Sequence, residues 1–178
     1  MPSNQNQFII HMTPTETTIT KEIILEALSR VTDPEIPTLS VVDLGIVTDI
    51  DIRNDNAVSV TITPTFVGCP AIEVMQQDVY NCLKQLDLSD VKVTVNYDTP
   101  WDSNRISEKG KQALRSFGLA PPPSFDLVLE LDILHQAICP YCQSTNTVMQ
   151  TPFGPTLCRS IHYCHDCSQA FEQFKPVG

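Results

Sequence analysis

Basic residues, glycine and tryptophan are scarce in this sequence. Its 178 residues include 11 lysines and arginines against 21 aspartates and glutamates, a net charge of −10 with neutral histidine, together with six glycines and one tryptophan. Such an acidic balance opposes the phosphate backbone of a nucleic acid, which binds to basic surfaces. A phosphate-binding loop, a dinucleotide fingerprint and a Ser-His-Asp order are absent as well, so nucleotide-dependent and triad-based enzymes find no support.

Long hydrophobic runs are also missing. The first ten residues (MPSNQNQFII) lack the basic start of a signal peptide, and their apolar stretch is too short for its core. No stretch approaches the ~20 apolar residues that a membrane-spanning helix needs. We therefore expect no membrane contact, a cytoplasmic location and cysteines in their reduced form.

Seven cysteines stand out against this background. Their odd number excludes a framework in which all cysteines are paired within one chain. In a reducing compartment, closely spaced cysteines indicate metal binding or reactive thiols before they indicate disulfides.

Changes in composition divide the chain into four parts. Residues 1–18 are polar and predict a mobile leader, whereas the alternating apolar patterns of residues 19–120 predict an α+β domain. Residues 121–138 begin with three prolines and continue as an apolar linker. Closely spaced cysteine, histidine and aromatic residues then mark residues 139–178 as a separate small module.

The pattern within residues 19–120 predicts an α-β-β-α-β-α order. Helical spacing of apolar residues begins after Thr20, a suitable cap, and a later helix ends at Gly118. Alternating apolar residues, often β-branched, predict the strands. We expect helices over residues 20–33, 70–86 and 107–117, and strands over residues 46–53, 58–62 and 91–97. This order describes an α+β fold in which helices pack on a small mixed sheet.

Two Cys-x-x-Cys pairs predict a zinc ribbon in the last part of the chain. Cys139 and Cys142 form the first pair, and Cys164 and Cys167 form the second after an interval of 21 residues. Four thiolates on two tight turns suit the tetrahedral geometry of a closed structural zinc site. The alternative, a thioredoxin-like redox pair, lacks the surrounding βαβ pattern. Cys158 is either a buried small hydrophobe or an accessory thiol, that is, an alternative metal ligand or a thiol for metal transfer.

A third thiol, Cys69, lies where a strand leads into a helix. The positive end of a helix favours the thiolate, the form that attacks electrophiles and binds metals, and so lowers the pKa of the thiol. Neighbouring carboxylates at positions 33, 35 and 43 would raise this pKa if they lie close. Packing under the helix is the alternative interpretation, and the spacing alone leaves both open. The carboxylates of Asp33, Glu35 and Asp43 also have two interpretations. They are either exposed acids around the end of a helix or groups that take part in catalysis.

These segments resemble known families. Residues 33–37 (DPEIP), 42–45 (VDLG) and 63–70 (TPTFVGCP) resemble the domain of SufT-type iron–sulfur assembly proteins. In the ribbon, residues 153–158 (FGPTLC) and 171–175 (FEQFK) restrict the resemblance to one group within these proteins. Together the two parts are similar to the PaaD family, accessory proteins of the bacterial phenylacetyl-CoA epoxidase system. The likeness covers residues 20–119 and 139–175.

The resemblance implies a role in maturation rather than catalysis. The resemblance implies that the chain helps to assemble a metal centre of the epoxidase complex, iron–sulfur or diiron, with no substrate turnover and no catalytic residues of its own. The resemblance implies structural zinc and transient iron or an iron–sulfur cluster as cofactors. The implied partners are the oxygenase subunit, the reductase subunit or a second copy of the chain.

The resemblance also assigns roles to particular residues. It makes Cys69 the metal- or cluster-handling thiol, and the zinc ligands are Cys139, Cys142, Cys164 and Cys167. The residues implied to surround Cys69 are Asp33, Glu35, Asp43 and Thr63.

Two other functions remain as alternatives. A nucleic-acid-binding or transcription accessory ribbon would need basic charge, yet residues 139–178 carry two basic and two acidic residues. A thiol-dependent enzyme using Cys69 as nucleophile would need a base, and the sequence identifies no suitably placed histidine.

Overall fold

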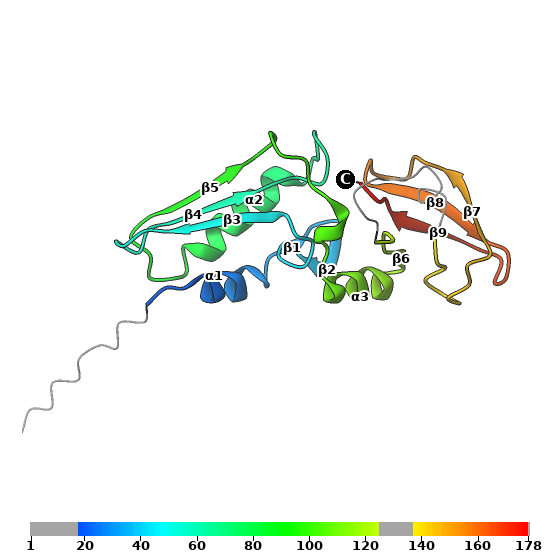
Figure 1. Ribbon diagram of the computed structural model, residues 1–178, viewed down its shortest axis with the longest axis horizontal. Coiled ribbons are helices and arrows are strands. Elements are labelled where there is room, and N and C mark those ends of the chain that lie inside the picture. The colour runs from blue at the N-terminus through cyan, green and yellow to red at the C-terminus, as the bar shows by residue number, and fades with distance from the viewer. Residues whose placement is uncertain (1–17, 125–136, 178) are drawn as a thin grey trace, which may run out of the picture.

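The computed structural model describes residues 18–124 and 137–177. The predicted leader and the apolar part of the predicted linker therefore lie almost wholly outside the described residues. We refer to residues 19–120 as the first module and to residues 139–177 as the ribbon. Figure 1 shows the two lying side by side, with the C-terminal end of the last strand turned toward the first module.

The first module contains three α-helices and six strands among the described residues. The helices are α1 (Lys21–Leu28), α2 (Ile72–Leu83) and α3 (Glu108–Phe117), preceded by a 3-10 turn, η1 (Ser103–Arg105). The strands are β1 (Thr32–Asp33), β2 (Ile36–Ser40), β3 (Val47–Ile52), β4 (Val58–Ile62), β5 (Val91–Val95) and β6 (Leu119–Ala120). The predicted order of helices and long strands is confirmed, and β1, β2 and β6 are additions.

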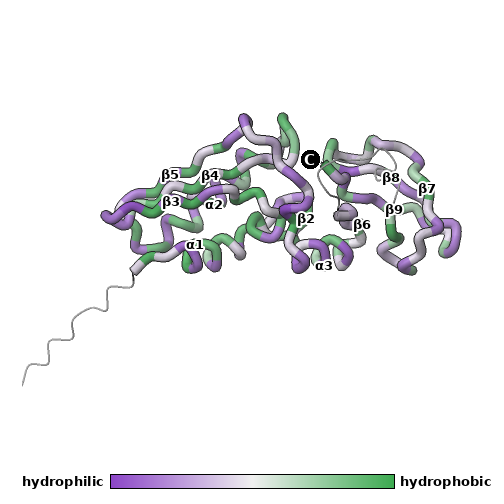
Figure 2. Tube along the Cα trace, viewed as in Figure 1, coloured by the Kyte–Doolittle hydropathy of each residue, from purple (hydrophilic) through white to green (hydrophobic). Residues whose placement is uncertain are grey.

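A three-stranded mixed sheet forms the centre of the first module. Strand β3 pairs antiparallel with β4, and β4 pairs parallel with β5, in the order β3-β4-β5. Helix α2 packs against β5, and α1 packs against α2. The predicted apolar stripe of α2 is buried, and it consists of Ile72, Met75, Val79 and Leu83. Figure 2 shows hydrophobic stretches along these strands and a hydrophilic turn between β3 and β4.

The ends of the helices follow the predicted capping. The hydroxyl of Thr20 accepts a hydrogen bond from the backbone N–H of Ile23 at the start of α1. Gly118 ends α3 with a φ of 92°, a left-handed conformation that costs glycine little. Helix α1 is shorter than expected, because it ends at Leu28 and the chain enters β1 before Pro34.

The hairpin of β1 and β2 is the main element that the sequence pattern missed. Its strands pair antiparallel through Thr32 with Ser40 and through Asp33 with Ile36. Prolines at positions 34 and 37 argue against strands in this segment, since proline has no N–H to donate to a neighbouring strand. The sequence pattern therefore did not indicate the hairpin. The hairpin holds Asp33 and Glu35 at its turn.

The ribbon is a three-stranded antiparallel sheet that the first module extends by one strand. Its strands are β7 (Thr147–Thr151), β8 (Arg159–Cys164) and β9 (Gln169–Phe174). Strand β6 of the first module pairs parallel with β9, so the whole sheet has the order β6-β9-β8-β7. One sheet therefore includes residues from both modules.

The two modules also share a hydrophobic core. Phe174, the last residue of β9, is buried in the main core of the first module. Its ring meets Trp101 edge to face, with the ring centroids 5.9 Å apart. The backbone N–H of Ser103 donates to the carbonyl of Val177 at 2.8 Å. The C-terminal end of the ribbon is thus part of the packing of the first module.

A smaller core lies between the ribbon and β6, and it consists of Ala120, Ala137, Cys139, Cys164 and Phe171. Across the described ranges 18–124 and 137–177, no helix has the length and apolar character required to cross a membrane.

Candidate metal and thiol sites

Two similar turns bring the four ribbon cysteines together. In the first turn, the backbone N–H of Gln143 donates to the carbonyl of Cys139 at 3.0 Å. The residue directly after each second cysteine is left-handed, with φ of 62° at Gln143 and 58° at Ser168. Neither residue is glycine, so no residue type in these turns indicated the left-handed backbone in advance.

The two turns are joined by polar contacts through Asp166. Its carboxylate accepts hydrogen bonds from the hydroxyl of Ser144 and from the amide of Asn146. These bonds hold the pKa of Asp166 below its ordinary value. The backbone N–H of His165 also donates to the carbonyl of Asn146 at 3.0 Å. These hydrogen bonds therefore link the two turns in addition to the cysteines.

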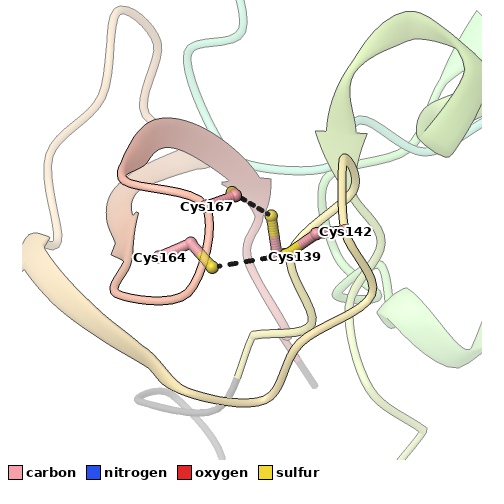
Figure 3. Close-up of side chains that lie close together, drawn as sticks. All are labelled: Cys139, Cys142, Cys164 and Cys167. Carbon is pink, nitrogen blue, oxygen red and sulfur yellow. Dashed lines mark hydrogen bonds between the residues drawn. The ribbon is translucent and has the colours of Figure 1, made fainter.

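The four sulfurs form a compact group (Figure 3). All of them lie within 4.8 Å of one another. The Sγ atoms of Cys139 and Cys167 are 3.6 Å apart, and those of Cys142 and Cys164 are 3.5 Å apart. A tetrahedral site with zinc–sulfur bonds of about 2.3 Å separates its sulfurs by about 3.8 Å. The group therefore fits a metal ion of this kind.

The pKa values of Cys164 and Cys167 are shifted in opposite directions. Backbone N–H groups, first that of Cys167 and then that of Asp166, lower the pKa of Cys164 to about 7. Loss of solvent contact, together with the neighbouring sulfurs, raises the pKa of Cys167 to about 12. Four adjacent thiolates repel one another, and a bound divalent cation removes that repulsion.

Cys69 lies in the loop between β4 and α2, three residues before the helix begins. Its carbonyl accepts a hydrogen bond from the N–H of Ile72 at 3.3 Å. Gly68 immediately before it has a φ of 89°, which only glycine adopts without strain. The thiol is half-buried and packs against the main core.

The surroundings of Cys69 act on its pKa in both directions. Burial, the largest influence, raises its pKa above the ordinary value, and nearby Asp33, Cys158 and Glu35 add to the rise. The backbone N–H of Ala71 lowers the pKa, as expected for a thiol beside a helix start, but this effect is smaller. Of the two opposing effects expected from the sequence, the raising one prevails, because desolvation and two carboxylates outweigh one helix-end donor.

Asp33 and Glu35 share the β1–β2 turn. One carboxylate oxygen of Asp33 accepts hydrogen bonds from the N–H groups of Glu35 at 2.7 Å and Ile36 at 3.1 Å. Asp33 is only 8 % exposed. The carboxylate of Glu35 lies 3.8 Å from the guanidinium of Arg159, which belongs to the ribbon. These contacts place both acids at the boundary between the modules.

Asp43 and Thr63 have contacts of a different kind. Asp43 accepts hydrogen bonds from Ser40 and Ser107, each at 2.7 Å, and pairs with Lys109 at 3.1 Å. Thr63 is buried, and its hydroxyl lies 3.0 Å from that of Thr48 on β3. Neither residue is among the groups that shift the pKa of Cys69. Their membership of the Cys69 neighbourhood stays a prediction.

Arg159 is a residue at this boundary that the sequence patterns did not indicate. Its guanidinium lies 3.0 Å from the carboxylate of Glu172 and 3.4 Å from the backbone carbonyl of Glu35. Its side chain is 10 % exposed. A single arginine in a charge-balanced module carries no pattern that marks it as buried, so only the structure could find it.

Comparisons with known proteins agree with this arrangement. Residues 21–115 match the family described as iron-sulfur cluster assembly protein. Residues 130–175 match the PaaD zinc beta ribbon domain. The chain belongs to the iron–sulfur cluster assembly protein family and carries a PaaD zinc ribbon. The resemblance predicted from the motifs is confirmed, and the match to the ribbon together with the four-sulfur group supports metal binding there.

Individual relatives of this PaaD-type chain are similar over different lengths. It is 30 % identical over 150 residues to an Escherichia coli protein named as one subunit of a "Putative 1,2-phenylacetyl-CoA epoxidase", covering 84 % of this chain and 89 % of that protein. It is 35 % identical to the "Fe-S protein maturation auxiliary factor YitW" of Bacillus subtilis, covering 53 % of this chain and 92 % of that protein.

Among solved structures, the chain is similar to a domain of unknown function, DUF59, from Bacillus anthracis. The two are 30 % identical with a TM-score of 0.49, and the likeness covers 52 % of this chain and 89 % of that one.

Proposed function

We propose that this PaaD-type chain assists the assembly or maturation of a metal centre in a phenylacetyl-CoA epoxidase complex and turns over no substrate itself. The similarity to an epoxidase subunit over 84 % of the chain supports the choice of client. The similarity of its first module to maturation auxiliary factors supports the role. The centre it serves is iron–sulfur or diiron.

The contrast between two thiol sites is the observation that carries this proposal. In the ribbon, four sulfurs lie within 4.8 Å of one another and can enclose a metal ion. Cys69 is one half-buried thiol whose pKa is raised by two carboxylates, and among the described residues it belongs to no closed group of metal ligands. A closed set holds its metal for structure, whereas an incomplete set can pass its metal to another protein.

The two sites therefore have different metals in this proposal. Structural zinc binds to Cys139, Cys142, Cys164 and Cys167, because the spacing of their sulfurs suits its tetrahedral geometry. Iron, alone or in a cluster, is the cargo, and Cys69 is its thiol ligand. The client, a second copy of the chain or another residue of the same chain supplies the missing ligands.

The oxygenase and reductase subunits of the epoxidase are the proposed partners, and the cytoplasm is the proposed location.

The geometry supports neither of the two alternative functions. A raised pKa leaves Cys69 a weaker nucleophile at neutral pH than a thiol enzyme needs. The ribbon keeps its balanced charge, since Arg159 pairs with Glu172 and Glu35.

The test is the metal content of the client. Cells that produce the epoxidase subunits would receive this chain, its Cys69→Ser variant or its Cys82→Ser variant. Cys82 is the matched control, because it is also half-buried with a raised pKa, but its thiol donates to the carbonyl of Ala27 in α1. After purification without oxygen, iron per oxygenase and per reductase is measured together with epoxidase activity.

We expect Cys69→Ser to lower the iron content and activity of one subunit at least tenfold, and Cys82→Ser to leave both unchanged. Thermal unfolding of each purified variant verifies that the first module is folded. Full iron content and activity beside a folded Cys69→Ser protein would show that Cys69 is a packing residue and would overturn the proposal.

A further inference from the structure

Two loops at one end of the central sheet enclose a small pocket in the first module. Residues 63–67 follow β4 and residues 96–101 follow β5, and both segments line the pocket together with Val177. Figure 1 shows these loops at the end of the sheet nearest to the ribbon. The volume of the pocket is about 200 Å³. Pockets for drug-sized ligands have volumes of ~300–1,000 Å³, so this one suits a single side chain of another protein.

The inner wall of the pocket needs no polar partner. Trp101 is 3 % exposed, and its indole N–H donates to the carbonyl of Leu44 at 3.3 Å. Thr63 is 2 % exposed, and its hydroxyl lies 3.0 Å from that of Thr48. Because these polar groups are already bonded within the chain, an apolar side chain can fill the pocket without leaving them unpaired.

The outer part of the lining exposes apolar side chains to solvent. Val67 is 78 % exposed and Tyr97 is 52 % exposed. Figure 2 shows that the loop after β4 is hydrophobic at its tip. Exposed apolar and aromatic residues beside a pocket are typical of a surface that another protein covers.

The two loops and the segments next to them carry negative charge only. Residues 63–83 and 93–104 contain four carboxylates and no lysine or arginine. Two of these carboxylates, those of Glu73 and Asp98, are exposed. The part of the lining near the end of the chain follows Lys175, whose ammonium donates to a backbone carbonyl of the ribbon at 3.3 Å. Basic residues of a partner would therefore be attracted to this end of the module.

We infer that this pocket is the docking site of the client, and that the client inserts one apolar side chain that is flanked by basic residues. This inference rests on the proposed function, because that function supplies the client. The partner is the oxygenase or the reductase subunit of the epoxidase. The inserted side chain supplies the apolar contact, and the basic residues around it meet the carboxylates beside the pocket.

The same loop carries Cys69, the thiol proposed to hold the cargo. Val67 lies two residues before Cys69. The backbone N–H of Cys69 donates to the carbonyl of Phe66, a residue that lines the pocket, at 3.4 Å. A client held in the pocket therefore contacts the loop from which the metal would be transferred.

The affinity of the client for the chain measures this contact. The zinc-loaded full chain would be titrated calorimetrically into each subunit, purified from cells that lack this chain. We expect Val67→Ser/Tyr97→Ser to weaken binding of one subunit about tenfold or more, because the apolar contacts around the inserted side chain are lost. Val148→Ser/Tyr80→Ser is the matched control and should bind as the wild type does. Val148 and Tyr80 are 40 % and 37 % exposed and lie outside the pocket lining.

The contribution of charge is tested by a second pair of variants. Glu73→Gln/Asp98→Asn should weaken binding about threefold at low salt, and added salt should remove the difference, since surface charges are screened. Asp51→Asn/Asp87→Asn removes the same charge from exposed positions near the other end of the sheet and should have a smaller effect. An equal effect of both pairs would mean that the client does not meet the carboxylates beside the pocket, and would overturn the inference.

Trp101 permits a measurement without any substitution. It is the one tryptophan of the chain and lines the pocket, so growth with 5-fluorotryptophan places a single fluorine signal there. The unlabelled client contributes no fluorine signal. We expect the fluorine NMR signal to shift when the client subunit binds.

Several results would overturn the inference. They are an unshifted signal in a bound complex, wild-type affinity of folded Val67→Ser/Tyr97→Ser, and failure of both subunits to bind the unmodified chain. A shift that grows with the concentration of this chain alone would assign the pocket to a second copy and would overturn the inference as well.

The outcome is separable from that of the proposed function. If Val67→Ser/Tyr97→Ser binds and matures the client as the wild type does while Cys69→Ser matures none, the function stands and the docking site is wrong. If Val67→Ser/Tyr97→Ser loses binding while Cys69→Ser matures the client fully, the docking site stands and the function is wrong.

Discussion

At the scale of single residues, Asp43 shows how one carboxylate can join distant segments. It accepts hydrogen bonds from Ser40, in its own turn, and from Ser107, the cap of α3. Burial works against its charge, but the bonds from Ser40, Ser107 and Lys109 prevail and lower its pKa below the ordinary 3.8. This carboxylate therefore supports the fold, whatever it contributes near Cys69.

We predict that Asp43→Asn lowers the free energy of unfolding by about 1–2 kcal/mol at pH 7, since charged hydrogen bonds are lost and the ion pair is partly screened. A carboxylate with a lowered pKa stabilises the fold above its ordinary pKa and loses this effect as the pH falls through the folded-state value. The difference between variant and wild type should hold from pH 7 to about pH 5 and narrow below about pH 4. Urea unfolding across this range measures it.

Asp90→Asn is the control for this prediction. Asp90 is exposed and lies 3.8 Å from Arg53. Its replacement should change the free energy of unfolding by less than about 0.5 kcal/mol. An equal effect of both variants at pH 7 would mean that the bonds of Asp43 contribute no stability of their own.

At the scale of elements, helix α3 is held closely against the turn of residues 40–45. The backbone N–H of Ser107 donates to the carbonyl of Asp43 at 2.9 Å. One turn later, a methyl group added to Gly110 would lie 2.6 Å from that same carbonyl oxygen. Gly110 is thus required by packing, although its helical position would suit alanine.

Helix propensity and packing therefore predict opposite signs for Gly110→Ala. Propensity alone favours alanine by about 1 kcal/mol. Because backbone cannot yield as a side chain does, we expect the variant to destabilise the protein by about 1–3 kcal/mol. The control variant is Ser116→Ala, at an exposed position of the same helix. Its stability should equal that of the wild type or exceed it by up to about 0.5 kcal/mol. Thermal unfolding measures both variants. A stabilised Gly110→Ala would show that α3 moves away from the turn at little cost.

At the scale of the whole molecule, the ribbon and the first module share a sheet and a core. Strand β6 pairs with β9, and Phe174 packs on Trp101. Trp101 is the one tryptophan of the chain and is 3 % exposed. Its fluorescence thus reports on the ribbon as well as on its own module.

We predict that zinc removal unfolds the ribbon and shifts the emission of Trp101 to longer wavelength, while the helical signal of the first module persists. Structural zinc supplies about 10–16 kcal/mol in comparable small modules, and the ribbon core is small. Once the ribbon unfolds, Phe174 no longer covers Trp101, and water reaches the indole. Chelator titration followed by fluorescence and circular dichroism measures both signals.

Cys142→Ser should produce the same red shift without chelator, and Cys82→Ser should not. Readdition of zinc should reverse the shift in the wild type. An unchanged emission after complete zinc removal would mean that the contacts with the first module hold the ribbon together without metal.

Local patterns in the sequence determined much of this protein. The apolar stripe of α2, the alternating strands and the Cys-x-x-Cys pairs each depend on residues within a few positions of one another, and the structure contains all of them, although α1 ends earlier than expected. Local hydrogen bonding and side-chain periodicity have the same short range, which is why a sequence reveals them. The motifs at residues 33–37 and 63–70 likewise indicated the family.

Contacts between distant residues were decided only by the tertiary structure. The pairing of β6 with β9, the burial of Arg159 and the packing of Phe174 on Trp101 join positions at least 50 residues apart. The same holds for Cys69, whose pKa depends on burial and on acids of a hairpin that its own segment does not reveal. Burial and charge act through space, so the sequence supplied the thiol, and the fold determined its environment.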